Sequence, residues 1–167
     1  MPKLLSFPNP VNETSARIVA AGAVVIGTTF IVTGNSWILA VLTYGFVARV
    51  LSGPTLSPLG RLATQVITPR LNVQHRFVPG PPKRFAQGVG AAFTLIATGL
   101  IVADATTAAR IVIAMLVVAA LLEAVFAICL GCIVFGWLMR LGVIPDDVCE
   151  ECNNFIAPSW ATTTPPA

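Results

Sequence analysis

Charged residues are scarce in this chain, and their scarcity excludes most soluble folds. Of the 167 residues only 10% are charged, whereas 56% are hydrophobic, and the mean hydropathy is +0.84. A soluble domain carries about 25% charged residues, because polar side chains have to cover most of its surface. The composition therefore predicts an all-α membrane protein, whose apolar segments lie in lipid rather than in a folded interior.

Histidine and the usual catalytic motifs are also lacking. The chain has one histidine, His75, which we interpret as a solvated loop residue. It has no phosphate-binding glycine loop, no hydrolase triad and no paired catalytic carboxylates. Nothing in the pattern indicates a nucleic-acid partner. These absences favour an accessory protein over a self-contained enzyme.

Long hydrophobic runs take the place of these features, and they predict four transmembrane helices arranged as two hairpins. The expected spans are residues 15–33, 37–51, 85–103 and 107–129. A turn at 34–36, Gly-Asn-Ser, separates the first two spans. The last apolar run continues as one helix to about residue 141. Such a helix exceeds a hydrocarbon core of about 30 Å, so part of it leaves the membrane.

The segments outside the spans have distinct compositions. Residues 1–14 form a cytoplasmic N-terminal segment, 15–141 the transmembrane domain and 142–167 an acidic cytoplasmic tail whose end is expected to be disordered. Between spans two and three, Ser57 and Pro58 begin a short amphipathic helix. We expect this helix to lie in the lipid headgroup region, and the alternative is a helix packed on the bundle.

Positive charge is crowded into the loop between spans two and three. The loop and its borders carry Arg49, Arg61, Arg70, Arg76, Lys83 and Arg84. Only Arg110 falls on the opposite side of the predicted membrane. The positive-inside rule then predicts a multi-pass protein of the cell membrane with both termini in the cytoplasm, which agrees with four spans.

The same loop is a candidate docking surface. Basic clusters next to a membrane attract anionic lipid and acidic partners. The residues expected to make such contacts with lipid or a partner are Arg61, Arg70, Arg76, Lys83 and Arg84. A purely structural subunit of a membrane complex, docking through this loop, is one interpretation of the whole protein.

Four cysteines form the most specific pattern in the sequence. They fall into two Cys-x-x-Cys pairs, Cys129 with Cys132 and Cys149 with Cys152, and sixteen residues separate the pairs. This spacing is typical of four-thiolate zinc sites. Both pairs are expected on the cytoplasmic side, so the sequence predicts a site for zinc, or alternatively for an iron–sulfur cluster.

Thiol chemistry at Cys129 and Cys132 is the alternative to metal binding. A reactive cysteine needs a helix N-terminus or a nearby cation to stabilise its thiolate. The expected continuous helix places the first pair toward its C-terminal half, and carboxylates surround the second pair, so both contexts disfavour a thiolate. A third interpretation is that the cysteines are small apolar packing residues.

Glu123 is the one carboxylate within the predicted spans. An acid in the membrane is costly and usually faces a partner or a cavity. We expect a hydrogen bond or ion pair with Arg49 or Tyr44 rather than a proton relay. On a continuous helix Glu123 lies on a different face from Cys129 and Cys132, which argues against a role as their base.

Two segments of the chain resemble a known family. The sequences RFAQGVG at 84–90 and AVFAICLGC at 124–132 are similar to a bacterial membrane family, common in actinobacteria and catalogued as domain of unknown function 4395. The similarity covers about residues 12–139. It implies a four-span protein with a functional or structural cysteine pair, working beside thioredoxin-like or sulfurtransferase proteins. The second pair lies beyond the shared region, so the resemblance brings thiol or sulfur-transfer chemistry level with metal binding.

Overall fold

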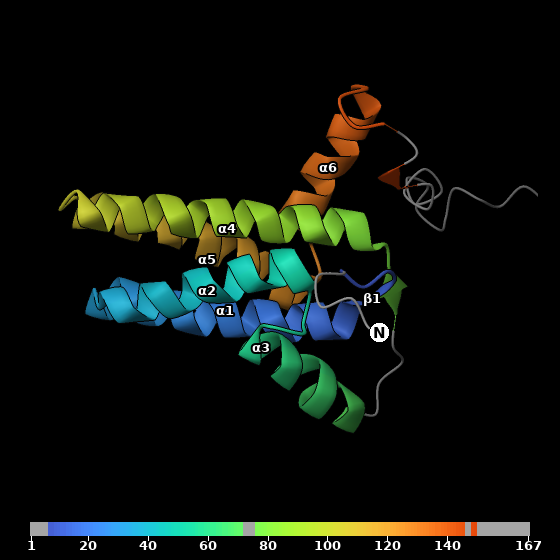
Figure 1. Cartoon of the computed structure of the whole chain (residues 1–167), viewed down its shortest axis with the longest axis horizontal. Coiled ribbons are helices and arrows are strands. Elements are labelled where there is room, and N and C mark those ends of the chain that lie inside the picture. The colour runs from blue at the N-terminus through green and yellow to red at the C-terminus, as the bar shows by residue number, and fades with distance from the viewer. Residues whose placement is uncertain (1–6, 72–75, 146–147, 150–167) are drawn as a thin grey trace, which may run out of the picture.

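The structure, a computed structural model, describes residues 7–71, 76–145 and 148–149, and this part of the chain is mostly helical. Within these residues, three helices are long and apolar enough to cross a membrane: α1 (Glu13–Thr33), α4 (Gly80–Val102) and α5 (Thr106–Phe126). The shorter apolar helix α2 (Ser36–Ser52) lies alongside them (Figure 1). The expectation of a mostly helical protein with membrane-like helices is therefore confirmed.

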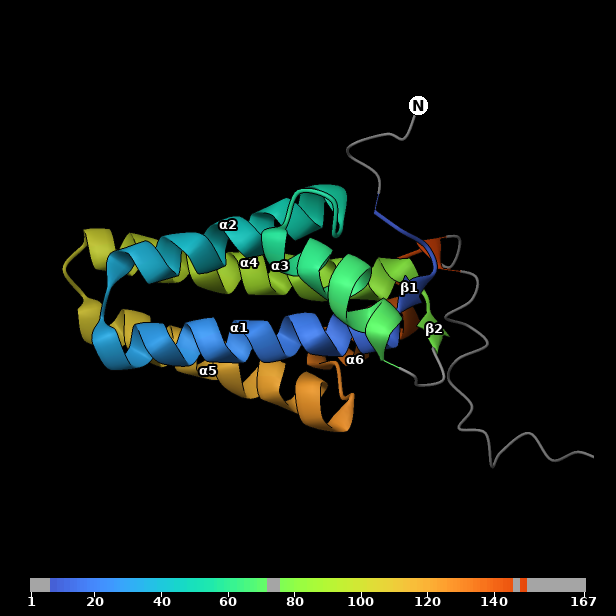
Figure 2. The same ribbon diagram turned by 90° about the horizontal axis from the view of Figure 1, so that it is seen from below.

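These four helices lie side by side as a bundle (Figure 2). α1 packs against α5, α2 against α4, and α4 against α5. Phe30, Leu39 and Ile113 are fully or almost fully buried at its centre, and Ala97 and Ala109 are completely buried. Small residues at such contacts let helices approach closely, which is how helices associate in lipid.

The turn between α1 and α2 forms where the sequence predicts it. Gly34 ends α1 in the left-handed conformation, with φ 67°, and its N–H donates to the carbonyl of Phe30 at 2.7 Å. Glycine adopts this conformation without steric cost. Asn35 then caps α2, because its side-chain oxygen accepts a hydrogen bond from the N–H of Trp37 at 2.9 Å.

A helical segment follows α2 and consists of α3 (Pro58–Arg61), the π-helical turn η1 (Leu62–Ile67) and the 3-10 turn η2 (Thr68–Arg70). Its start confirms the predicted cap, since Ser57 Oγ accepts from the N–H of Gly60 at 3.2 Å. The segment packs on α1, where the hydroxyls of Thr68 and Ser15 hydrogen-bond at 2.8 Å. Its contact with lipid headgroups stays a prediction.

A short antiparallel pairing closes the same end of the bundle. β1 (Val11–Asn12) pairs with β2 (Phe77–Val78), with Val11 opposite Val78. Asn12 also caps α1 through a 2.9 Å hydrogen bond from the N–H of Thr14, so α1 begins at Glu13 rather than at residue 15. α4 likewise begins before residue 85, at Gly80, because prolines are favoured in the first helical turn.

The prediction of one continuous last helix is wrong. α5 ends at Phe126, Ala127 adopts the left-handed conformation with φ 57°, and α6 (Leu130–Arg140) begins after Cys129. Arg17 of α1 explains where α5 stops. Its Nε donates to the carbonyl of Ala124 at 3.0 Å and its Nη2 to that of Val125 at 2.9 Å, so the last carbonyls of α5 are satisfied by a side chain.

α6 leaves the bundle at a steep angle to α4 (Figure 1). The crossing point is Gly131, where a Cβ atom would lie 2.6 Å from the Cα and the Cβ of Ala86. No side chain fits between these backbones, so glycine permits the close approach. The turn between α5 and α6 and this contact together fix the position of the first cysteine pair.

Candidate functional site

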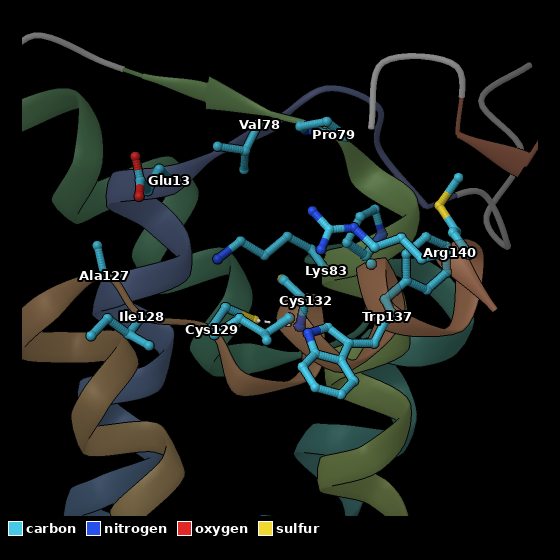
Figure 3. Close-up of a pocket in the computed structure, with 15 residues that line it drawn as sticks. Glu13, Val78, Pro79, Lys83, Ala127, Ile128, Cys129, Cys132, Trp137 and Arg140 are labelled. Carbon is cyan, nitrogen blue, oxygen red and sulfur yellow. Dashed lines mark hydrogen bonds between the residues drawn. The ribbon is translucent and has the colours of Figure 1, made fainter. Parts of the chain in front are cut away.

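A surface pocket of about 500 Å³ lies where α4 begins and α6 leaves the bundle. Cys129 and Cys132 line it together with Lys83, Trp137 and Arg140 (Figure 3). The pocket therefore gives access to the first cysteine pair, although Cys129 itself is only 8% exposed.

Cys129 occupies the N-cap position of α6, and its Sγ accepts a hydrogen bond from the N–H of Cys132 at 3.4 Å (Figure 3, dashed line). The partial positive charge of a helix N-terminus stabilises a thiolate at this position. The sequence-based expectation that this pair lies in the C-terminal half of a helix is thus reversed. The cause is the break after α5, which turns residue 129 into a helix start.

The two thiols of the pair are not equivalent. The pKa of Cys129 is lowered from its ordinary value, chiefly by the hydrogen bond with the Cys132 thiol and further by the charge of Lys83, against the opposing effects of burial and Glu123. The pKa of Cys132 is raised, chiefly by the same hydrogen bond and by burial. Cys129 is therefore the thiol of the pair that loses its proton more readily.

An ion pair lies next to the cysteines. Lys83 Nζ and Glu123 Oε1 are 2.6 Å apart, with side chains only 9% and 14% exposed. Both charges act on Cys129. Lys83 is thus buried against an acid and is not the exposed lipid or partner contact that the sequence suggested. Glu123 therefore pairs with Lys83 of α4 and not, as the sequence predicts, with Arg49 or Tyr44 of α2.

The side chain of Tyr44 donates instead to the carbonyl of Leu56 at 3.1 Å. The other loop cations are also engaged: Arg61 Nε donates to the carbonyl of Thr55 at 2.6 Å, and Arg84 Nε to that of Val50 at 3.1 Å. Arg76 Nε lies 3.7 Å from Glu13 Oε2, and Arg70 is exposed. Docking through this loop remains a prediction.

The second cysteine pair is only half described. Cys149 is buried against Phe135 and Met139, toward the other end of α6, and it is disulfide-bonded. Cys129 and Cys132 are free thiols. Cys152 and His75 lie outside the described residues, as do the acidic residues 146–147 and 150–151.

The structure leaves the four-cysteine metal site as a prediction. Among the residues that it describes, no three or more of histidine, cysteine, aspartate and glutamate are grouped as they would be around a metal ion. A four-thiolate site would need Cys149 and Cys152 to join a pair that lies at the start of α6, whereas Cys149 packs further along that helix. The zinc and iron–sulfur predictions are untested by this arrangement.

Two features of the site escaped the sequence-based reasoning, although each left a signal. An apolar run too long for one span indicates a break, and the position of that break places Cys129 at a helix start. An acid within a span indicates a buried cation as its partner. Lys83 fits this requirement, but its place in a basic stretch suggested a solvated residue.

Comparison with known proteins agrees with the resemblance seen in the sequence. The chain matches the family described as domain of unknown function (DUF4395) over residues 11–140, from β1 to the last residue of α6. No curated protein and no solved structure is detectably similar to it. The matched range includes Cys129, Cys132 and Lys83 but not Cys149. The chain belongs to the DUF4395 family.

Proposed function

We propose that this DUF4395 protein is a membrane-bound thiol–disulfide exchanger, in which Cys129 and Cys132 react with a soluble thiol partner at the surface pocket. The observation that carries the proposal is the position of Cys129 Sγ at the N-cap of α6. A helix N-terminus and a neighbouring cation are the two features that activate a cysteine. The helix N-terminus is present here; Lys83 also lines the pocket, but Glu123 offsets its charge, so the N-cap position carries the argument.

The reaction follows from the difference between the two thiols. The Cys129 thiolate attacks a disulfide of the partner, so that a mixed disulfide forms and one partner sulfur leaves as a thiolate. Cys132 then attacks Cys129, which releases the second partner sulfur and forms the Cys129–Cys132 disulfide. Two electrons pass from this protein to the partner, and the reverse sequence oxidises a partner dithiol. In a sulfur-transfer variant, the Cys129 thiolate attacks the outer sulfur of a partner persulfide, the partner thiolate leaves, and Cys129 carries the sulfane sulfur as a persulfide.

The membrane arrangement belongs to the same proposal. α2 also crosses the membrane, which brings the number of spans to four. It lies along the bundle beside α4, although it is shorter than α1, α4 and α5 (Figure 2). The basic loop and both termini face the cytoplasm. The segment from α3 to η2 lies at the headgroup level, with Leu62 and Val66 exposed on its outer side.

Alkylation as a function of pH tests the proposed nucleophile. A lowered pKa leaves the Cys129 thiolate populated as the pH falls, so iodoacetamide should modify Cys129 first, with a midpoint below the ordinary thiol value of about 8.5. Mass spectrometry of the variants Cys129→Ser and Cys132→Ser identifies the modified residue. Preferential alkylation of Cys132, or a midpoint at the ordinary value, contradicts the proposal.

Trapping experiments test the exchange itself. With glutathione disulfide as the probe, Cys132→Ser should accumulate a mixed disulfide on Cys129, because the resolving thiol is absent. Cys129→Ser should give none. The metal site is supported instead if the protein holds about one zinc per chain and loses it when either cysteine pair is replaced. Such a protein should also be inert toward glutathione disulfide.

Thiol accessibility tests the orientation. A membrane-impermeant maleimide should label Cys132 in permeabilised cells but not in intact ones, since the surface pocket is expected to face the cytoplasm. Labelling of Cys132 in intact cells places the pocket on the outside and removes the cytoplasmic arrangement.

A further inference from the structure

A second cavity, of about 350 Å³, lies inside the helical bundle and shares Cys129 with the surface pocket. Its walls are mostly apolar, with Phe46, Phe93 and Leu116 among the lining residues. The polar lining residues are Arg49, Gln87, Glu123 and Cys129. We call this space the inner cavity. A cavity with apolar walls and a few polar groups suits a lipophilic ligand with a polar head.

The inner cavity is bordered by residues on the outer surface of the bundle. Met115 of α5 is 57% exposed and Val134 of α6 is 49% exposed, and both line the cavity. Apolar side chains on this surface of a membrane protein face lipid. We infer that a ligand dissolved in the membrane reaches the inner cavity between α5 and α6, where these two residues lie.

Arg49 lines the inner cavity and carries one donor without a partner among the described residues. The residue is only 4% exposed, its Nε donates to Gln87 Oε1 at 2.9 Å, and its Nη1 donates to Ser57 Oγ at 3.2 Å. Its guanidinium carbon lies 4.5 Å from the centre of the Phe46 ring. Nη2 is buried and has no hydrogen-bond partner in the described part of the chain. A buried charged donor without an acceptor is costly, and a carbonyl or anionic oxygen of a ligand would satisfy it.

The ion pair connects the two cavities. Lys83 lines the surface pocket, Glu123 lines the inner cavity, and their side chains meet at 2.6 Å. Cys129 lines both spaces. A thiol that is accessible from both sides can react with a soluble partner on one side and with a membrane-dissolved molecule on the other.

We propose that the inner cavity binds the head group of a lipid-soluble quinone, with Arg49 donating to a quinone oxygen, and that the Cys129–Cys132 dithiol reduces it. A quinone combines an apolar tail, carbonyl oxygens and the capacity to accept two electrons. This inference rests on the proposed thiol exchange, and it names the molecule that re-forms the Cys129–Cys132 disulfide after the soluble partner has reduced it.

The reaction balances without a further reagent. The Cys129 thiolate adds to a carbon of the quinone ring and forms a carbon–sulfur bond. Cys132 sulfur then attacks Cys129, so that the disulfide forms, the carbon–sulfur bond breaks and its electron pair returns to the ring as a hydroquinone anion. The two thiol protons end on the two hydroquinone oxygens. Two thiols are oxidised for each quinone reduced, and Arg49 stabilises the oxyanion as it develops.

The test uses the reduced full-length protein in nanodiscs with decylubiquinone, whose fully substituted ring disfavours permanent arylation of thiols. Hydroquinone is measured by absorbance, and free thiols are counted in the same samples. We expect two thiols to be lost for each hydroquinone formed. Double replacement of Cys129 and Cys132 by serine should abolish the reaction.

Matched variants locate the quinone site. Met115→Trp obstructs the inner cavity from an exposed position, and Val118→Trp is its control on the same helix, because Val118 is 58% exposed and is not a lining residue of the described inner cavity. We expect quinone reduction to fall at least about tenfold in the first and to stay unchanged in the second. Arg49→Gln should cause a similar loss, since a hydrogen bond from a charged donor is worth about that factor, whereas Arg61→Gln should not.

The outcomes separate this inference from the proposed function. Exchange with glutathione disulfide should persist in Met115→Trp, since the surface pocket is unaltered. If the protein exchanges thiols but does not reduce decylubiquinone, or if Met115→Trp reduces it at the original rate, the quinone site is wrong and the thiol exchange stands. If neither glutathione disulfide nor decylubiquinone reacts, both proposals fail.

Discussion

The two ends of the helical bundle are built differently. At one end the helices are joined by short turns, at Gly34 and at Asp104, whose hydrogen bonds are local in sequence. At the other end, interactions between distant segments dominate: the Lys83–Glu123 ion pair and the bonds from Arg17 to α5. The turn end is thus held by local turns and caps that any helical hairpin can form. The α6 end concentrates buried polar groups, which are costly unless they are functional or fully paired.

Breaking the ion pair should have the largest effect on stability. Glu123→Gln or Lys83→Met leaves one charge buried without its partner, and such changes typically cost about 3–5 kcal/mol. The double variant Lys83→Met/Glu123→Leu should recover most of this loss. Unfolding of the detergent-solubilised protein, followed by circular dichroism, gives the comparison. If each single variant is as stable as the double variant, the ion pair between Lys83 and Glu123 contributes nothing to the free energy of unfolding.

The crossing of α6 over α4 offers the next test. Gly131→Ala should destabilise the protein by about 1–3 kcal/mol, because the new Cβ would lie 2.6 Å from the backbone of Ala86. The matched control is Gly136→Ala on the same helix, where none of the described atoms lies within 4 Å of the added Cβ. This control should be neutral or stabilise the helix by up to about 1 kcal/mol. Equal losses in both variants would mean that α6 does not pack on α4.

A pair of capping variants compares the two ends directly and has the smallest effect on stability. Arg17→Gln removes side-chain donors from the last turn of α5, and Asn35→Ala removes the cap of α2. Each should cost about 1 kcal/mol. Only Arg17→Gln should also change the rate of Cys129 alkylation, because it loosens the break that places Cys129 at a helix start. A similar change of rate in Asn35→Ala would show that the ends are not independent.

The parts of the fold that local chemistry determines could be predicted from the sequence. Gly34 defines a turn by its backbone preference, whereas Asn35 and Ser57 cap helices through their side-chain oxygens. Long charge-free runs locate the apolar helices. α4 begins before its charge-free part and includes the buried Lys83.

The candidate site could not be predicted to the same extent, because its geometry depends on contacts between segments far apart in the chain. No glycine or proline marks the end of α5, and Ala127 adopts a conformation that alanine rarely takes. Arg17, which satisfies the carbonyls there, lies more than one hundred residues away. The cysteine spacing therefore predicts a thiol pair, but it does not predict that Cys129 lies at a helix start.

The bonds from Arg17 to α5 have a consequence for how the protein is made. Their partners lie 107 and 108 residues apart in sequence, and a nascent chain leaves the ribosome N-terminus first. Arg17 is therefore synthesised long before Ala124 and Val125. The direction of α6 is set only after nearly the whole domain has been translated, so the N-cap position of Cys129 is one of the last features of the fold to form.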